Sequence, residues 1–273
     1  MKTIAAFLLV LCHLAISHAW NCDKVSQLSD VQQIDAGLGQ VVATDKHNYA
    51  YFLSGSSWDR LPSDNIKHVT VGHAGIWAVD TNNYIYKLVA GKWSRVNGKN
   101  GPFFFTLFVC LPCMLAQIDA GGNLFIAGAN HVNKAYCLTT SDTLDFKGVG
   151  SVDWTQMPTS LKYYSCGPYG CWGVDTSSRV HLTQSVTPSN CDNSDWMQIS
   201  GLALKMVEVG SDGSVFGVNT SGQVYQRTGI TSSVPEGTTW TQVPMSATMK
   251  HVSYDLGHLW VVSTSGQVFQ CTE

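Results

Sequence analysis

A block of about 40 residues recurs six times along the chain, and this internal repeat constrains the fold more than any other feature. Its clearest copy, Ile66–Val96, contains four short hydrophobic segments separated by turns. Five further copies begin near Ile34, Ile118, Tyr163, Leu204 and His251. Six four-stranded units predict an all-β protein, a six-bladed β-propeller. A β-sandwich or a trefoil is the alternative, although a trefoil would group the repeats by three.

The two ends of the chain predict how the ring of blades closes. The last copy stops at Glu273, before its fourth, Trp-containing segment, whereas Trp20 follows no earlier strands of a repeat. We therefore expect an N-terminal strand to complete the last blade. Cys22 and Cys271 would then lie on neighbouring strands, where a disulfide would lock the ring.

The composition agrees with this fold class. Of the 19 acidic residues only three are glutamate, and the others are aspartate, which favours turns over helices. A charged fraction of 13% and 25 glycines argue against a helical bundle and against a doubly wound α/β enzyme. The formal net charge of -3 provides no basic footprint, so we expect no nucleic-acid partner.

The first 19 residues read as a secretory signal peptide. Lys2 precedes an apolar stretch from Ile4 to Leu14, and Ser17-His18-Ala19 has the small-x-small pattern of a cleavage site. Residues 20–273 then form a single propeller domain of a secreted, extracellular protein. In that oxidising compartment its cysteines are expected to form disulfides rather than metal or redox sites.

Recurrent motifs carry a family resemblance. Trp58-Asp-Arg-Leu-Pro62 returns as Trp154-Thr-Gln-Met-Pro158, and Trp77-Ala-Val-Asp80 returns as Phe216-Gly-Val-Asn219. With the stretches Cys166–Cys171 and His251–His258, the chain resembles the tectonin-repeat family of β-propeller lectins, which includes the fish egg lectins. The resemblance implies a secreted, carbohydrate-binding lectin. Its implied partners are N-acetylglucosamine-type sugars and microbial surface glycans, including bacterial lipopolysaccharide, and its implied role is innate defence of egg or mucosa.

One segment interrupts the repeat. The late Trp of a blade precedes the next first strand by 10 to 12 residues, except after Trp93, where Ile118 follows by 25. Residues 101–115 account for the excess as an apolar insertion, too short to span a bilayer, and we expect no membrane span. The insertion is open to three interpretations: an apolar tip that meets a membrane or partner, an extra strand pair, or translated intron. Sequencing the transcript would show whether residues 101–115 are translated intron.

The repeat positions also choose among the cysteine pairings. Cys12 lies in the signal peptide, and Cys110 and Cys113 lie in the insertion, where C-x-x-C without a βαβ pattern does not predict redox catalysis. Cys166 ends a first strand and Cys171 begins the second, so they face each other across a turn. With the closing pair assigned, Cys137 and Cys191 remain and would join neighbouring repeats.

Sugar-binding residues are expected on the face formed by the Gly-rich loops between the first and second strands. A sugar needs planar polar groups and an aromatic face on a rigid support. The polar and aromatic candidates beside these loops are His73, Tyr169, Asp212, Asp255 and His258.

Other conspicuous residues have structural interpretations. The recurrent strand aromatics, such as Trp77 and Trp172, favour blade packing over sugar stacking. Asp80 and Asp175 suit turns, and His68 and His251 occupy equivalent strand positions, which favours a structural role. Asn219-Thr-Ser221 is a glycosylation acceptor on an expected turn.

The sequence predicts a binding protein and not an enzyme. It lacks H-E-x-x-H, G-x-S-x-G and phosphate-loop motifs, and most acids recur with the repeat or lie in turns. We expect no cofactor and no metal site; a calcium site built from Asp and Asn loops stays open, although no EF-hand spacing exists. The alternative function is a structural egg-coat or scaffold propeller without sugar binding.

Overall fold

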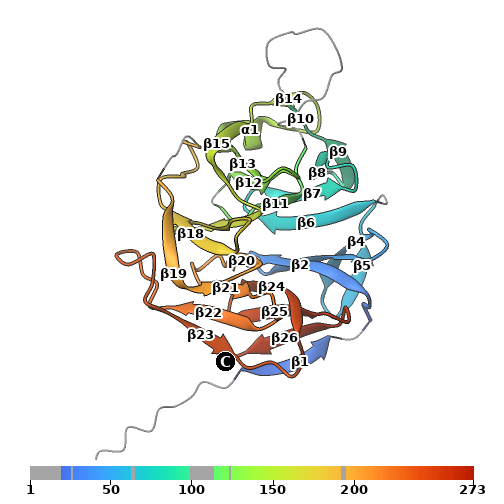
Figure 1. Cartoon of the computed structure of the whole chain (residues 1–273). Coiled ribbons are helices and arrows are strands. Elements are labelled where there is room, and N and C mark those ends of the chain that lie inside the picture. The colour runs from blue at the N-terminus through green and yellow to red at the C-terminus, as the bar shows by residue number, and fades with distance from the viewer. Residues whose placement is uncertain (1–19, 26, 63–64, 99–113, 123, 192–194) are drawn as a thin grey trace, which may run out of the picture.

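The computed structural model describes residues 20–273 except 26, 63–64, 99–113, 123 and 192–194. Six four-stranded antiparallel sheets surround a central axis, as the sequence predicts (Figure 1). From the innermost strand outward, the first three blades are β2 (Val31–Gly37), β3 (Gln40–Asp45), β4 (Ala50–Ser54) and β5 (Ser57–Arg60); β6 (Ile66–Gly72), β7 (Gly75–Asp80), β8 (Ile85–Val89) and β9 (Lys92–Arg95); and β11 (Gln117–Asp119), β12 (Ile126–Ala129), β13 (Lys134–Leu138) and β15 (Thr155–Ser160).

The other three blades have the same order. They are β16 (Tyr163–Gly167), β17 (Gly170–Val174), β18 (Arg179–Thr183) and β19 (Met197–Ala203); β20 (Met206–Val209), β21 (Val215–Val218), β22 (Val224–Thr228) and β23 (Thr239–Val243); and β24 (Met249–Asp255), β25 (His258–Ser263), β26 (Val268–Thr272) and β1 (Asn21–Val25). The hairpins between first and second strands lie at one end of the axis, here called the loop face. The turns between second and third strands lie at the other end, the turn face.

The N-terminal strand completes the last blade, which confirms the predicted closure. β1 pairs antiparallel with β26, and Cys22 lies directly opposite Cys271 in that register. The structure contains the Cys22–Cys271 disulfide as well as the other two predicted bonds, Cys137–Cys191 and Cys166–Cys171.

A ring of backbone hydrogen bonds joins each blade to the next on the turn face. The residue that enters an innermost strand donates its N–H to the carbonyl of a left-handed turn residue in the preceding blade. The six donors are all buried aliphatic residues or methionine: Val31, Ile66, Leu115, Leu161, Leu204 and Met249. Their acceptors are Gly266, Asn48, Asn83, Asn133, Ser178 and Gly222.

Leu115 is the third blade's member of this ring, fully buried and bonded to the carbonyl of Asn83. The spacing of the repeats predicts Leu115 as the last residue of the 101–115 insertion, whereas in the structure Leu115 belongs to the third blade. The insertion that the spacing predicts therefore ends before Leu115. Residues 101–113 themselves lie outside the described residues, as does the predicted signal peptide at 1–19.

Polar residues at the start of the turn-face turns explain the excess of aspartate. Asp80 Oδ1 accepts the backbone N–H groups of Asn82 and Tyr84, and Asp175 Oδ1 accepts those of Ser177 and Arg179. These bonds satisfy donors that the sharp reversal would otherwise leave unpaired. The assignment of Asp80 and Asp175 to turns agrees with this geometry.

In five blades glycine ends the innermost strand or lies one or two residues beyond its end, because the next blade approaches too closely for a side chain. A Cβ at Gly72 would lie 1.9 Å from the carbonyl oxygen of Ala120, and one at Gly37 would lie 2.4 Å from that of Val71. Contacts this short exclude any side chain. The loop-face hairpins thus begin at positions fixed by blade-to-blade packing.

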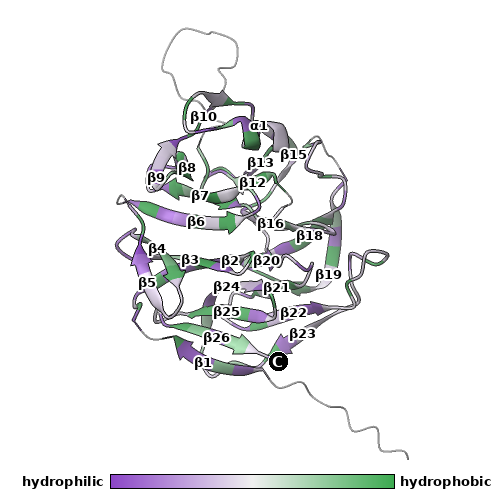
Figure 2. Ribbon diagram, turned by 180° about the vertical axis from the view of Figure 1, so that it is seen from behind, coloured by the Kyte–Doolittle hydropathy of each residue, from purple (hydrophilic) through white to green (hydrophobic). Residues whose placement is uncertain are grey.

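The third blade departs from the repeat. A short helix, α1 (Thr140–Asp145), and strand β14 (Ser151–Val152) lie between β13 and β15 in the chain. Strand β14 pairs in parallel with β10 (Asn97–Gly98), which follows β9 (Figure 1). Lys87 of the second blade donates to the carbonyls of Thr143 and Phe146 at the end of α1. Hydropathy alternates along the blade strands, with hydrophobic residues in each blade (Figure 2). Among the described residues, no helix is long and apolar enough to cross a membrane.

Candidate functional site

A cavity opens on the loop face between the third, fourth and fifth blades. Its volume is about 670 Å³, within the range of small-ligand sites. The hairpin from Gly167 to Gly170 forms one wall, and the segment from Gln184 to Pro188 forms another. The remaining lining comes from neighbouring blades: His73, Gly121, Phe125, Ser211 and Ser232.

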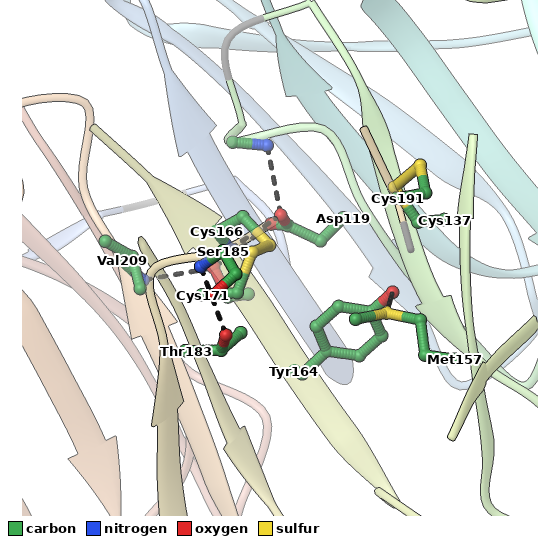
Figure 3. Close-up of a disulfide and its surroundings, with 12 residues drawn as sticks. Asp119, Cys137, Met157, Tyr164, Cys166, Cys171, Thr183, Ser185, Cys191 and Val209 are labelled. Atoms are coloured by element: carbon green, nitrogen blue, oxygen red, sulfur yellow. Dashed lines mark hydrogen bonds between the residues drawn. A yellow bond between two sulfur atoms is a disulfide. The ribbon is translucent and has the colours of Figure 1, made fainter. Parts of the chain in front are cut away.

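Two disulfides hold these walls in place. Cys166–Cys171 closes the hairpin at the base of Gly167 to Gly170, and Cys137–Cys191 ties the segment that follows β18 to β13. Figure 3 shows both bonds, with the ring of Tyr164 drawn between them. Because all four sulfurs belong to buried residues, the cavity walls rest on covalent supports within the core.

A buried carboxylate adds a further anchor to the hairpin wall. Asp119 Oδ2 accepts the backbone N–H of Cys166 at 3.0 Å and that of Gly121 at 3.2 Å (Figure 3). Gly121 and Gly167 both line the cavity, so Asp119 fixes two of its walls relative to each other. The site is thereby preorganised, which lowers the entropic cost of binding.

The chemistry of the cavity suits a small neutral ligand with many hydroxyls. Phe125 and Tyr169 supply aromatic surface, and Gln184, Ser211 and Ser232 supply amide and hydroxyl groups. Among the described residues that line it, none is a carboxylate or a lysine or arginine. Hydrogen bonding and ring stacking, rather than charge, would therefore hold the ligand.

The structure brings two of the five predicted sugar-binding residues together. His73 and Tyr169 both line the cavity, His73 exposed and Tyr169 half-buried. Asp212 instead lines a smaller neighbouring cavity of about 240 Å³ that lies between the fifth blade's hairpin and β22. A Cβ on Gly213 would meet the Tyr169 ring at 2.4 Å, so Tyr169 packs against the hairpin between the two cavities.

Asp255 and His258 do not line either cavity. Asp255 is 3% exposed; its Oδ2 accepts the N–H of Gly39 at 2.6 Å, and its Oδ1 accepts the hydroxyl of Ser211. Because Ser211 lines the larger cavity, the carboxylate of Asp255 positions that hydroxyl from behind. His258 lies on β25, where its Nδ1 contacts Nε2 of Gln270 at 3.0 Å.

Asn219 occupies the turn-face position that aspartate holds in other blades. Its Oδ1 accepts the N–H of Gln223, and its Nδ2 donates to the side chain of Gln223. Glycosylation at Asn219 stays a prediction.

Several lining residues escaped the sequence analysis, among them Phe125, Gln184, Ser211 and Ser232. Loop length is the signal that marks Gln184 and Ser232, whereas Phe125 and Ser211 lie between first and second strands. The third and fourth strands are joined by two residues in each of the first two blades, but by 13 residues after Thr183 and 10 after Thr228. These long connections rise on the loop face and supply Gln184 and Ser232 to the rim.

Polar side chains at one strand position form a ring around the central axis. In chain order this ring alternates acid and hydroxyl: Asp35, Thr70, Asp119, Ser165, Glu208 and Ser253. Thr70 donates to Asp35 Oδ2 at 2.8 Å, and the N–H of Ala120 in the following blade donates to the Thr70 hydroxyl at 2.8 Å. The ring thus satisfies N–H groups on the inner edges of five blades, those of Ala36, Val71, Ala120, Cys166 and Val209.

Burial gives the acids of this ring unusual proton affinity. Desolvation, followed by the charge of Asp35, raises the pKa of Asp119 to about 8. Desolvation and the charges of Asp35 and Asp119 also raise the pKa of Glu208. Within the described part of the chain, however, no three His, Cys, Asp or Glu side chains gather closely enough to hold a metal ion.

Three aromatic rings from alternate blades meet across the axis nearer the turn face. The ring centroids of His68, Tyr163 and His251 lie 5.9 to 6.2 Å apart. The Tyr163 hydroxyl donates to Glu208 and contacts Nε2 of His251 at 3.1 Å. Burial lowers the pKa of His68 to about 3, and that of His251 well below its usual range, so both imidazoles are neutral. Their geometry agrees with the structural role expected for His68 and His251.

Comparisons with known proteins agree with this architecture. A stretch of 101 residues aligns with the fish-egg lectin of Cyprinus carpio at 42% identity. It makes up 37% of this chain and 42% of that lectin. The matched stretch thus spans less than half of the relative's length.

Solved structures with the same fold are distant in sequence. A gluconolactonase from Xanthomonas campestris has a TM-score of 0.63 at 11% identity, covering 92% of this chain and 89% of its own. The virginiamycin B lyase of Staphylococcus aureus has a TM-score of 0.57 at 11% identity, covering 93% and 99%. At this identity the likeness shows the propeller fold alone.

The family model of the tectonin domain matches residues 30–264, which includes strands of all six blades. This match confirms the resemblance that the Trp and Asp motifs indicated. The chain belongs to the tectonin family.

Proposed function

We propose that the chain is a secreted lectin whose loop-face cavity binds N-acetylglucosamine-type residues of microbial surface glycans, bacterial lipopolysaccharide among them. The observation that carries the proposal is the cavity's lining, which joins aromatic surface with neutral polar groups on a disulfide-supported frame. Membership of the tectonin family and the partial identity to a fish-egg lectin support the same function. Innate defence of egg or mucosa is the role that such binding would serve.

The cavity's geometry suggests how a sugar would be held. Tyr169 is half-buried against Gly213 and is therefore restricted, so stacking on its ring costs little side-chain entropy. Ser211, held by Asp255, and Gln184, which also lines the cavity, would hydrogen-bond the ring hydroxyls and the acetamido group. Because none of the described residues that line the cavity is a carboxylate, the pair of carboxyl groups that glycoside hydrolysis uses is not found among them, and we expect binding without turnover of the glycan.

A disulfide-bonded extracellular protein is the form in which this lectin would act. Three disulfides require an oxidising environment, which favours secretion. Several weak sites on a clustered ligand would give useful avidity, because linked binding events raise the effective concentration.

Titration of N-acetylglucosamine into the purified chain tests the proposal. We expect saturable binding that Tyr169→Ala weakens by about 1–3 kcal/mol, the range for loss of an aromatic stacking partner with its buried area. Tyr225→Ala is the matched control, since Tyr225 is also half-buried but lines neither cavity and should bind as the wild type does.

A glycan array with the same three proteins separates the alternatives. Array binding that free N-acetylglucosamine competes supports the lectin. Binding that free sugar does not compete supports a scaffold instead, and equal loss in the Tyr169 and Tyr225 variants contradicts the assignment of the cavity.

A further inference from the structure

Four lysines occupy one equivalent position at the turn-face end of the innermost strands. Each stands directly before the residue that faces the central axis, and in the remaining two blades the position holds Gln32 and Ala116. The four are Lys67, Lys162, Lys205 and Lys250. Three of them come from consecutive blades, the fourth, fifth and sixth, and so form a continuous arc. We call the four side chains the lysine ring.

The ammonium groups are partly withdrawn from water. All four side chains are half-buried, and desolvation lowers the pKa of each. Each ammonium donates to one neutral acceptor: Lys67 to Asn83, Lys162 to Ser178 at 3.1 Å, Lys205 to the carbonyl of Met249 at 3.1 Å, and Lys250 to Gln32 at 3.0 Å. An ammonium has three N–H donors, so each retains the capacity to bind further oxygen atoms.

The charges of the ring act on one another and on the axis. Lys205 lowers the pKa of Lys250, and both lower the pKa of His251. Lys67 likewise lowers the pKa of His68. Lys67 and Lys250 directly precede His68 and His251 in the chain, so their positive charges act on these two residues from the turn-face end of the innermost strands.

Carboxylates compensate this potential unevenly. Asp80 raises the pKa of Lys67, Asp175 that of Lys162, and Asp30 that of Lys250. Asp175 is already bonded to Arg179 and His181, and Asp30 to Lys46. Lys205, in the middle of the arc, has no carboxylate acting on its pKa among the described residues. Desolvated positive charge without a counter-charge is costly unless an anion accompanies it.

We propose that the turn-face mouth of the ring is an oxyanion site, in which Lys205 and Lys250 bind a phosphate or sulfate group; Lys205 Nζ lies on the carbonyl of Met249, the residue before Lys250. Ammonium groups bind such oxygens as point charges, with charge-assisted hydrogen bonds. The site is separate from the loop-face cavity: Lys67 and Gly72 lie at opposite ends of β6, about 17 Å apart at 3.3 Å per residue. The chain would then bind a neutral sugar on one face and an acidic group on the other.

Calorimetric titration of the full chain at low ionic strength with inorganic pyrophosphate, and in a second arm with sucrose octasulfate, tests the site. We expect at least one probe to bind, with affinity that falls as salt is added. Lys205→Gln with Lys250→Gln keeps the side-chain length and removes two charges, and it should weaken binding roughly tenfold or more. Lys24→Gln with Lys92→Gln is the control, since both lysines are exposed on outer strands.

Each outcome decides the proposal. If pyrophosphate alone binds, the site takes phosphate groups; if the octasulfate alone binds, it takes sulfate groups. Failure of both probes to bind, or equal weakening in the control pair, overturns it. N-acetylglucosamine binding, measured in the same proteins, should be unchanged by the Lys205 and Lys250 substitutions, so loss of one site is distinguished from loss of the other. If the double variant does not fold, each single Lys→Gln variant should weaken the probe about threefold.

Discussion

The closing disulfide should stabilise the propeller more than the hairpin disulfide does, because it closes a much longer loop. Cys22 and Cys271 are separated by 249 residues, Cys166 and Cys171 by five. The loop-closure entropy of the unfolded chain gives about 5.5 kcal/mol for the first bond and about 2.2 kcal/mol for the second. Replacing each pair with alanine should therefore produce losses that differ by roughly 3 kcal/mol.

Urea unfolding of the two double variants measures this difference. We expect the midpoint of the Cys22→Ala, Cys271→Ala protein to fall well below that of the Cys166→Ala, Cys171→Ala protein. Sugar affinity should change in the opposite order, since the hairpin bond supports a cavity wall and the closing bond does not. Equal destabilisation by the two pairs, or loss of affinity from the closing pair alone at temperatures where it is folded, would refute the reasoning.

Three further predictions concern the core and the axis. Leu115→Ala should cost about 2–5 kcal/mol in urea unfolding, against less than about 0.5 kcal/mol for Val149→Ala, which is 84% exposed; equal costs would place Leu115 outside the blade. Gly72→Ala should destabilise by about 1–3 kcal/mol, since its Cβ would meet the Ala120 carbonyl, and a neutral effect would contradict the close approach. The pKa of Asp119 is about 8 in the folded state and 3.8 in the unfolded chain. The stability that its bound proton contributes is therefore fully present below pH 3.8 and is lost as the pH rises to 8. Asp119→Asn should flatten the pH dependence of the melting temperature over that window, and an unchanged slope would assign it to other groups.

The ring architecture could be predicted because the sequence repeats the same physical requirement six times. Each blade needs a polar residue to start its turn-face turn, as at Asp80 and Asp175, and five need glycine where the next blade approaches, as at Gly72. The strand pattern and the position of Trp20 then fix the closure. The three disulfides followed because repeat alignment places their cysteines on neighbouring strands.

The site could be predicted only in part, because it is built where the repeat is broken. Asp255 stands where the other five blades have the glycine that follows the innermost strand's last axial residue. Its buried carboxylate joins two loops through Gly39 and Ser211 and is not an exposed sugar-binding group. The cavity rim comes from long connections after Thr183 and Thr228, whose lengths are visible in the sequence but whose paths depend on Cys191 and on packing against neighbouring blades. His73 and Tyr169 were found because they lie on the repeated hairpins.

The low overall charge gave no indication of the lysine ring or of the buried acids on the central axis. A net charge of -3 favoured a neutral ligand, yet the fold collects lysines from residues 67 to 250 at one end of the axis and acids within it. Repeat alignment shows this separation, whereas composition averages it away.

A crystal structure of the chain with N-acetylglucosamine tests the central claim most directly. The sugar should lie in the loop-face cavity, with its apolar face on Tyr169 and its polar groups within hydrogen-bond distance of Ser211 or Gln184. A sugar bound on the turn face, or on the loop face away from the fourth blade's hairpin, would contradict the account.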